Sequence, residues 1–200
     1  MNLFKIVFIL AAALYSRAAI GQEEKYKEFW SKTDAEFADA ETSPLKEDAL
    51  TSFDSIARFA YDSEYALMAK FEVLKRQKPF TFQTTGSIKQ RYQKAGILHF
   101  KVDTTVYQLS AYRNMEAMRL PGYDNRLFVP FTDESNGNGT YEGGRYLELE
   151  IPESDSTLVD FNMVYNPYCA YSDKYSCPIP PRENDLKVGI FAGAKSPKGK

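Results

Sequence analysis

Apolar and polar residues alternate with a period of two along most of the chain after residue 64. In the stretch 65–73 the odd positions carry Tyr, Leu, Ala, Phe and Val, while Met68, Lys70 and Glu72 stand at even positions. Such alternation is typical of a β-strand with one buried face. The same spacing predicts further strands at 81–86, 88–94, 97–103, 105–113, 127–131, 145–151, 158–164 and 186–192.

The predicted strands are short, and no helical segment separates one from the next. The connections 94–96 and 103–104 have the length of hairpin turns. We therefore predict a mainly β protein, a single-domain antiparallel β-sandwich or partly closed barrel.

The region before residue 64 has a helical period instead. Apolar and ring-bearing residues with spacings of three and four predict an N-terminal amphipathic helix over about 23–37, and a second, short helix is expected over about 44–53. The residues on the apolar face of the longer helix are Tyr26, Phe29, Trp30, Thr33 and Phe37.

Residues 1–21 have the features of a secretory signal peptide. Lys5 precedes the apolar run 6–14, and Ala19 and Gly21 are small residues of the kind that signal peptidase requires. The run is shorter than the ~20 residues that span a bilayer, so cleavage is favoured over an uncleaved anchor. The sequence thus predicts a periplasmic or secreted protein, with one domain over 22–200 and no membrane span after cleavage.

Removal of the predicted signal peptide leaves 23 basic and 27 acidic residues, a net charge of −4. A weakly acidic domain without a basic stripe lacks the charge that binding to nucleic acid requires. Nucleic acid is therefore not an expected partner.

Long polar motifs lie in the C-terminal half of the chain. They are TYEGGRY at 140–146, DFNMVYNPYCAY at 160–171 and CPIPPREN at 177–184, preceded by LFVPFTD at 127–133. In these motifs the chain resembles the DUF1684 family of uncharacterised proteins over about 23–195, in the short exported form of Bacteroidota-like sequences. Glu142 departs from the family pattern, which usually has a small residue there. The resemblance implies no particular activity.

The parity of two predicted strands suggests where a polar site could lie. Arg145 shares a strand face with Leu147, whereas Asp160 and Asn162 share a face of the strand 158–164. If the two strands form a hairpin, Arg145, Asp160 and Asn162 lie on one side of the sheet. They would then form either a structural ion pair or a ligand site in which Arg145 binds a carboxylate or phosphate.

Cys169 and Cys177 are the two cysteines of the chain. In an oxidising compartment this pair predicts a disulfide, and closing so short a loop is worth roughly 2.5 kcal/mol. A reduced pair or a metal site are the alternatives, but two cysteines do not complete a zinc shell and the single histidine, His99, is distant in the sequence. No metal or cofactor is predicted.

We expect a binding or structural module with a polar patch that could hold a sugar or another small polar ligand. The residues expected to frame the patch are Arg145, Tyr146, Asp160, Asn162, Asn166, Tyr171, Glu183 and Asn184.

The alternative is a carboxylate-using hydrolase that acts on a cell-envelope or small polar substrate. Asp133, Asp160 and Glu183 are the candidate carboxylates. His99 is expected to be a surface or cross-strand residue, because no nucleophile motif accompanies it.

Overall fold

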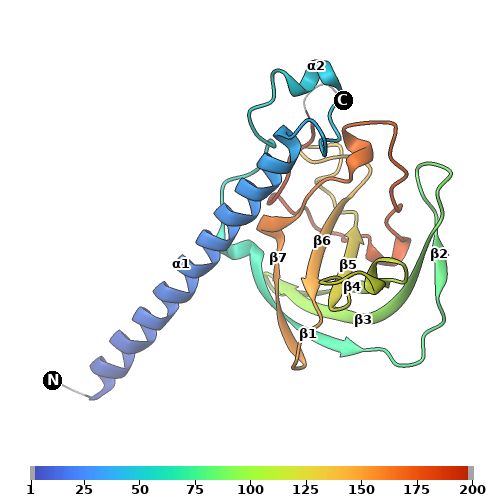
Figure 1. Cartoon of the computed structure of the whole chain (residues 1–200). Helices are drawn as coiled ribbons and strands as arrows, with labels where there is room; N and C mark the ends of the chain where they lie inside the picture. The colour runs from blue at the N-terminus through green and yellow to red at the C-terminus, as the bar shows by residue number, and fades with distance from the viewer. Residues whose placement is uncertain (1–2, 198–200) are drawn as a thin grey trace.

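The computed structural model describes the backbone of residues 3–197 and the side chains of residues 21–197. Seven antiparallel strands form one sheet in the order β6-β5-β4-β3-β1-β7, with β2 paired to β3. The sheet curls into a half-barrel (Figure 1), so the predicted mainly β fold and partly closed barrel are confirmed. The strands are β1 (Ala66–Val73), β2 (Phe80–Phe82), β3 (Gln90–Val102), β4 (Thr105–Asn114), β5 (Arg126–Phe131), β6 (Arg145–Glu150) and β7 (Ser156–Asp160).

β3 replaces two of the predicted strands, which were expected to be separated by a turn near residue 95. It pairs with β4 through most of its length, and the register shifts between Lys94 and Gly96. The predicted turn is therefore a β-bulge, which bends the strand without ending it. The second predicted hairpin is confirmed, because Val102 lies opposite Thr105.

The predicted hairpin between β6 and β7 is wrong. β6 pairs with β5, whereas β7 pairs with β1 at the opposite end of the strand order. β7 ends at Asp160, where the side chain accepts a hydrogen bond from the Asn162 amide and caps the 3₁₀-helix η3 (Phe161–Met163). The motif expected to continue as a strand is thus a capped turn.

The C-terminal segment, predicted as a strand over 186–192, has the alternating burial of a strand. It does not form the regular backbone hydrogen bonds of a strand with a neighbour. Leu186, Ile190 and Ala192 are buried. Backbone groups of the segment bond to loops instead, as in the 2.8 Å bond from the Leu186 amide to the Thr132 carbonyl. The prediction of a strand here is wrong, although the apolar positions are the buried ones.

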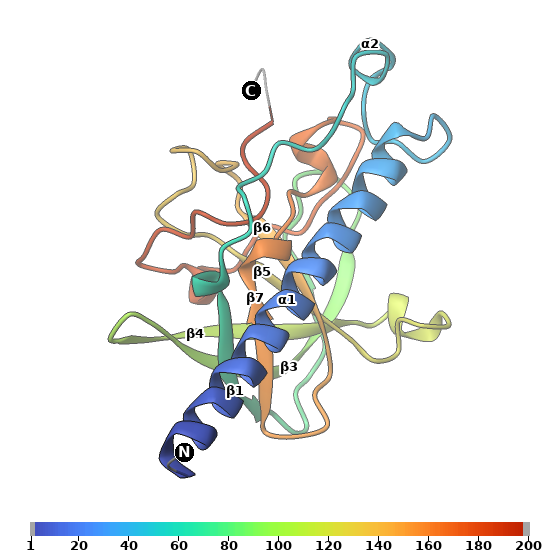
Figure 2. The same cartoon turned by 90° about the vertical axis from the view of Figure 1, so that its left-hand side faces the viewer.

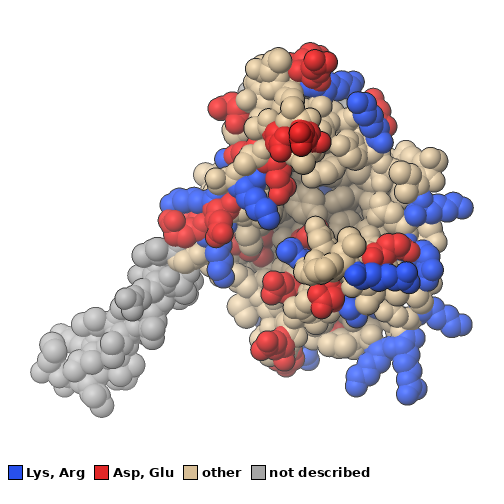
Figure 3. Space-filling view, viewed as in Figure 1, with Lys and Arg blue, Asp and Glu red and all other residues tan. Residues whose placement is uncertain are grey.

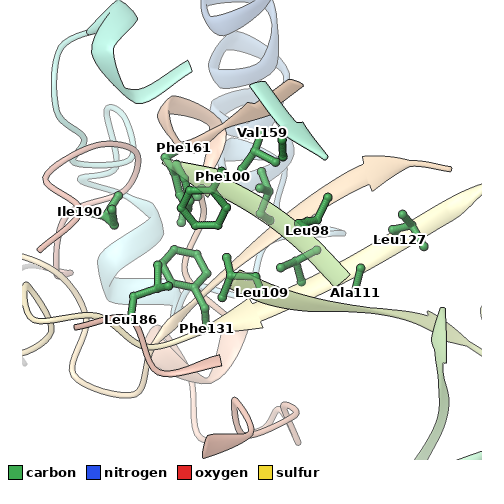
Figure 4. Packing of buried hydrophobic residues seen from close by; sticks show 14 of the residues in the cluster. Leu98, Phe100, Leu109, Ala111, Leu127, Phe131, Val159, Phe161, Leu186 and Ile190 are labelled. Carbon is green, nitrogen blue, oxygen red and sulfur yellow. The ribbon is translucent and has the colours of Figure 1, made fainter. Parts of the chain in front are cut away.

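The main core fills the half-barrel (Figure 4). Large side chains from the strands meet side chains from η3 and from the C-terminal segment, which covers the open side. The core residues labelled in the figure are Leu98, Phe100, Leu109, Ala111, Leu127, Phe131, Val159, Phe161, Leu186 and Ile190.

The helix α1 (Leu3–Ala38) lies across the half-barrel (Figure 2). Trp30 and Phe37 are buried in a second apolar cluster with Ile56, which confirms the predicted amphipathic helix. The predicted second helix is the single turn α2 (Glu47–Leu50). Within the described part of the chain, no helix is long and apolar enough to cross a membrane. Most side chains of the predicted signal peptide lie outside the described residues.

Candidate functional site

Arg145 does not meet Asp160, its expected partner. Its side chain is fully buried, and Nη2 lies 2.9 Å from Asp133 Oδ2. Nη1 and Nη2 also donate to the carbonyls of Ala192 (2.6 Å) and Ile190 (2.7 Å). Burial lowers the pKa of Arg145, while the charge of Asp133 raises it. Since these groups use the guanidinium inside the fold, Arg145 holds the C-terminal segment to the barrel, as the structural reading expected.

Asp160 and Asn162 form a second structural network. Asp160 Oδ1 accepts from the amide and the side chain of Asn162, at 3.0 and 2.8 Å. The Asn162 side chain also bonds to the backbone N–H and carbonyl of Asp62. The backbone carbonyl of Asn162 accepts a hydrogen bond from Trp30 Nε1 at 3.0 Å. Burial raises the pKa of Asp160. This network fixes α1 and the loop before β1 to η3.

Glu183 and Asn184 lie apart from both networks. Glu183 accepts a hydrogen bond from the Tyr112 hydroxyl and forms a 3.0 Å ion pair with Lys94. Asn184 is fully buried and bonds to the Ser110 backbone. Asp133, Asp160 and Glu183, the candidate carboxylates of a hydrolase, therefore each pair with different groups: Asp133 with Arg145, Asp160 with Asn162, and Glu183 with Tyr112 and Lys94.

His99 lies on the outer face of the sheet, where Nε2 is 3.0 Å from Glu72 Oε2 on the neighbouring strand. It is a cross-strand residue, as expected. Among the described residues, no group of three or more His, Cys, Asp or Glu side chains is placed to hold a metal ion.

Three of the predicted residues, Tyr146, Asn166 and Tyr171, line a cleft of about 670 Å³ between α1 and the sheet. Figure 3 shows this side of the molecule hollowed beside α1, with charged side chains around the hollow. We call it the tyrosine cleft. From α1 its lining includes Phe29, Lys32, Glu36 and Phe37, and from the sheet and its loops it includes Gln90, Tyr92, Asn114, Tyr123, Arg126, Phe128, Tyr146 and Glu148. The loop after η3 contributes Asn166, Tyr168, Tyr171, Tyr175, Ser176 and Cys177.

Aromatic rings from three strands of the sheet, together with Tyr165, form the floor of the cleft. Phe128 on β5 lies between Tyr92 on β3, at a centroid distance of 5.3 Å, and Tyr146 on β6, at 4.7 Å. Tyr165 continues the row at 5.9 Å from Tyr146. The strand parity expected for β6 is confirmed, because Tyr146 points to this cleft and Arg145 points away from it.

Hydrogen-bonding groups stand among these rings. Burial raises the pKa of Tyr92 to about 12, so its hydroxyl keeps its proton at neutral pH and donates to Gln90 Oε1 at 2.9 Å. Glu148 Oε1 accepts from the Tyr165 hydroxyl at 3.0 Å, and Glu148 Oε2 lies 3.3 Å from Arg126. Ring faces beside paired polar groups suit a ligand with both an apolar face and hydroxyls.

Asn166 is the most buried polar side chain of the cleft, only 2% exposed. Its Nδ2 donates to the Tyr171 hydroxyl at 3.1 Å and to the Lys195 carbonyl at 2.8 Å. Its Oδ1 is buried and has no partner in the described structure. A buried amide oxygen without a partner is uncommon in folded proteins.

The expected disulfide is absent from the structure, because no bond joins the sulfurs of Cys169 and Cys177. The Cys169 amide donates to Cys177 Sγ at 3.3 Å, so the two cysteines are in contact. Their proximity was predicted correctly, while their oxidised state was not.

Sequence reasoning missed most of the cleft. Tyr92, Phe128 and Glu148 were assigned only to strands, and Phe29 only to a helix face. These residues meet because the strand order and the position of α1 bring them together. The density of tyrosines near residue 168 was the one available signal.

Comparison with known proteins supplies a family and a fold. The family described as "Protein of unknown function (DUF1684)" matches residues 51–195, which begins later than the expected residue 23. No curated protein matches the chain. A solution NMR structure of an uncharacterized protein from Haloarcula marismortui is similar, with a TM-score of 0.73 and 30% identity over 92% of this chain and 99% of that one. This chain belongs to the DUF1684 family.

Proposed function

We propose that this protein binds a small polar ligand, a sugar or a short oligosaccharide, in the tyrosine cleft. The supporting observation is the cleft itself, about 670 Å³ with a floor of aromatic rings and a set of amide, carboxylate and guanidinium groups. Pockets for small ligands have volumes of roughly 300–1,000 Å³. Sugar rings have C–H faces that pack on aromatic rings and hydroxyls that bond to planar polar side chains.

The geometry also supports binding over hydrolysis. Glu148 is engaged by Arg126 and Tyr165, so its charge is already neutralised within the cleft. Asn166 lies at the cleft wall, where its side-chain nitrogen is held by Tyr171 and the Lys195 carbonyl. Such groups orient a ligand and need not transfer a proton.

A panel of mono- and disaccharides, followed by isothermal titration with the best of them, tests this proposal. A ligand at a hundred times its Kd stabilises the fold by about 2.7 kcal/mol, so binding should raise the melting temperature. We expect Tyr168→Ala, which removes a half-exposed ring from the cleft, to weaken binding about tenfold.

Phe191→Ala is the matched control. Phe191 is 44% exposed, against 38% for Tyr168, and it does not line the cleft. The control should bind as the unmodified protein does. If no saccharide changes the melting temperature, or if both variants bind equally, the proposal is wrong.

We also propose that the protein is exported and that its signal peptide is removed after Gly21. The contacts described between α1 and the body begin at Tyr26, whose hydroxyl donates to the Phe59 carbonyl at 2.7 Å. Cleavage would therefore leave the docked part of the helix in place. N-terminal sequencing of the protein recovered from its natural source should start at Gln22, and a start at Met1 would contradict the proposal.

A further inference from the structure

Cys169 and Cys177 stand in contact at the wall of the tyrosine cleft. Cys177 lines the cleft, and the Cys169 amide lies 3.3 Å from its sulfur. Both residues are 8% exposed, so the pair is sheltered, with Cys177 on the side of the cleft. Two cysteines this close can form a disulfide with little movement of the backbone.

Hydrogen-bond donors surround the sulfur of Cys169. Hydrogen bonds from the Cys177 thiol and from the hydroxyls of Thr85 and Tyr141 lower the pKa of Cys169, and they outweigh the opposite effect of burial. The thiolate is the nucleophile in thiol–disulfide exchange, and a thiol in purely apolar surroundings would have a raised pKa. The environment of Cys169 therefore favours reaction.

The loop between the cysteines forms part of the cleft, since Tyr171, Tyr175 and Ser176 line it. Cys177 is fixed at the far end of this loop, because its amide and carbonyl bond to Thr85 at 3.0 and 2.9 Å. We therefore expect that formation of a disulfide would move Cys169, Tyr171 and Tyr175 more than Cys177.

We propose that Cys169 and Cys177 are a redox-active dithiol that small disulfides oxidise, and that its oxidation state sets the ligand affinity of the cleft. The Cys169 thiolate attacks one sulfur of the small disulfide, which forms a mixed disulfide and releases one thiol. Cys177 then loses its proton and attacks Cys169, which releases the second thiol. The protein loses two electrons and two protons, and the small disulfide is reduced to two thiols.

The effect on ligand affinity rests on the proposed function, whereas the reactivity of the dithiol does not. The two parts are therefore tested separately.

The first test equilibrates the purified full chain with reduced and oxidised glutathione at varied ratios, and then alkylates the remaining thiols. Mass spectrometry should show a reversible change to a form about 2 Da lighter that takes up no alkylating agent. Cys169→Ser and Cys177→Ser should each stop at a mixed disulfide with glutathione. A pair that stays reduced at every ratio, or one that oxidises and cannot be reduced again, would overturn the proposal.

The second test measures the rate at which iodoacetamide modifies Cys169 as a function of pH. Thiolates react and thiols do not, so the rate in the unmodified protein should rise with a midpoint below the pKa of about 8.5 of a free cysteine. Cys177→Ala removes the main donor, so the pKa of Cys169 and the midpoint should both rise. Identical midpoints in the two proteins would show that Cys177 does not activate Cys169.

The third test compares the affinity of the reduced and oxidised protein for the best saccharide of the panel. We expect the two values to differ at least about fivefold, and the double variant Cys169→Ser, Cys177→Ser to be insensitive to glutathione. Equal affinities would overturn the coupling. Reversible oxidation without any saccharide binding would instead overturn the proposed function and leave the dithiol standing.

Discussion

Arg145→Met is expected to lower the free energy of unfolding by about 3–5 kcal/mol, because it breaks a fully buried ion pair. The substitution leaves Asp133 as a buried charge without its 2.9 Å partner. It also removes the donors of the Ile190 and Ala192 carbonyls, which anchor the C-terminal segment over the core. Urea denaturation of the variant measures the loss, and the melting temperature should fall by about 10 °C or more.

Arg126→Met is the matched control for this experiment. Arg126 also pairs with a carboxylate, Glu148, on an adjacent strand, but its side chain is 48% exposed. Exposed pairs contribute about 0–1 kcal/mol. If the two variants lose the same stability, the buried network does not hold the C-terminal segment, and a ligand-binding role for Arg145 would have to be reconsidered.

The sequence allowed prediction of the strands because their side chains alternate, and this alternation reflects burial alone. The alternation predicted the bounds of β1, β4, β5 and β6 closely. It also placed Arg145 and Tyr146 on opposite faces of one strand. For the same reason it mistook the C-terminal segment for a strand, since that segment has the burial pattern without a partner for its backbone.

Strand pairing depends on contacts distant in the sequence, which the alternation does not contain. β7 pairs with β1, and Arg145 therefore meets Asp133 and not Asp160. The residues of the expected polar patch therefore lie in separate places. Arg145, Asp160 and Asn162 form networks that hold the fold together, whereas Tyr146, Asn166 and Tyr171 line the cleft. The motifs that carry the family resemblance thus combine structural residues with cleft residues.

α1 connects the fold and the candidate site. One face of the helix docks on the body through Trp30, while Phe29, Lys32 and Glu36 form a wall of the tyrosine cleft. The position of that wall depends on the docking of the helix, because the cleft lies between α1 and the sheet.

Trp30→Ala should therefore reduce both stability and ligand affinity. Trp30 is 1% exposed, its Nε1 donates to the Asn162 carbonyl at 3.0 Å, and the Arg58 guanidinium lies 5.2 Å from its ring centroid. Removing so large a buried side chain costs about 3–5 kcal/mol. Urea denaturation measures the stability, and titration with the best saccharide measures the effect of an undocked helix on the cleft.

Trp30→Phe separates the two contributions of this side chain. It keeps an aromatic ring in the cluster and removes the donor to Asn162 with part of the ring volume, so the loss should be about 1–3 kcal/mol and the cleft should retain most of its affinity. Trp30 is the only tryptophan of the chain, so its fluorescence in the unmodified protein reports docking directly. An emission typical of a solvent-exposed indole, together with an unchanged stability in Trp30→Ala, would show that α1 does not form a wall of the cleft in solution.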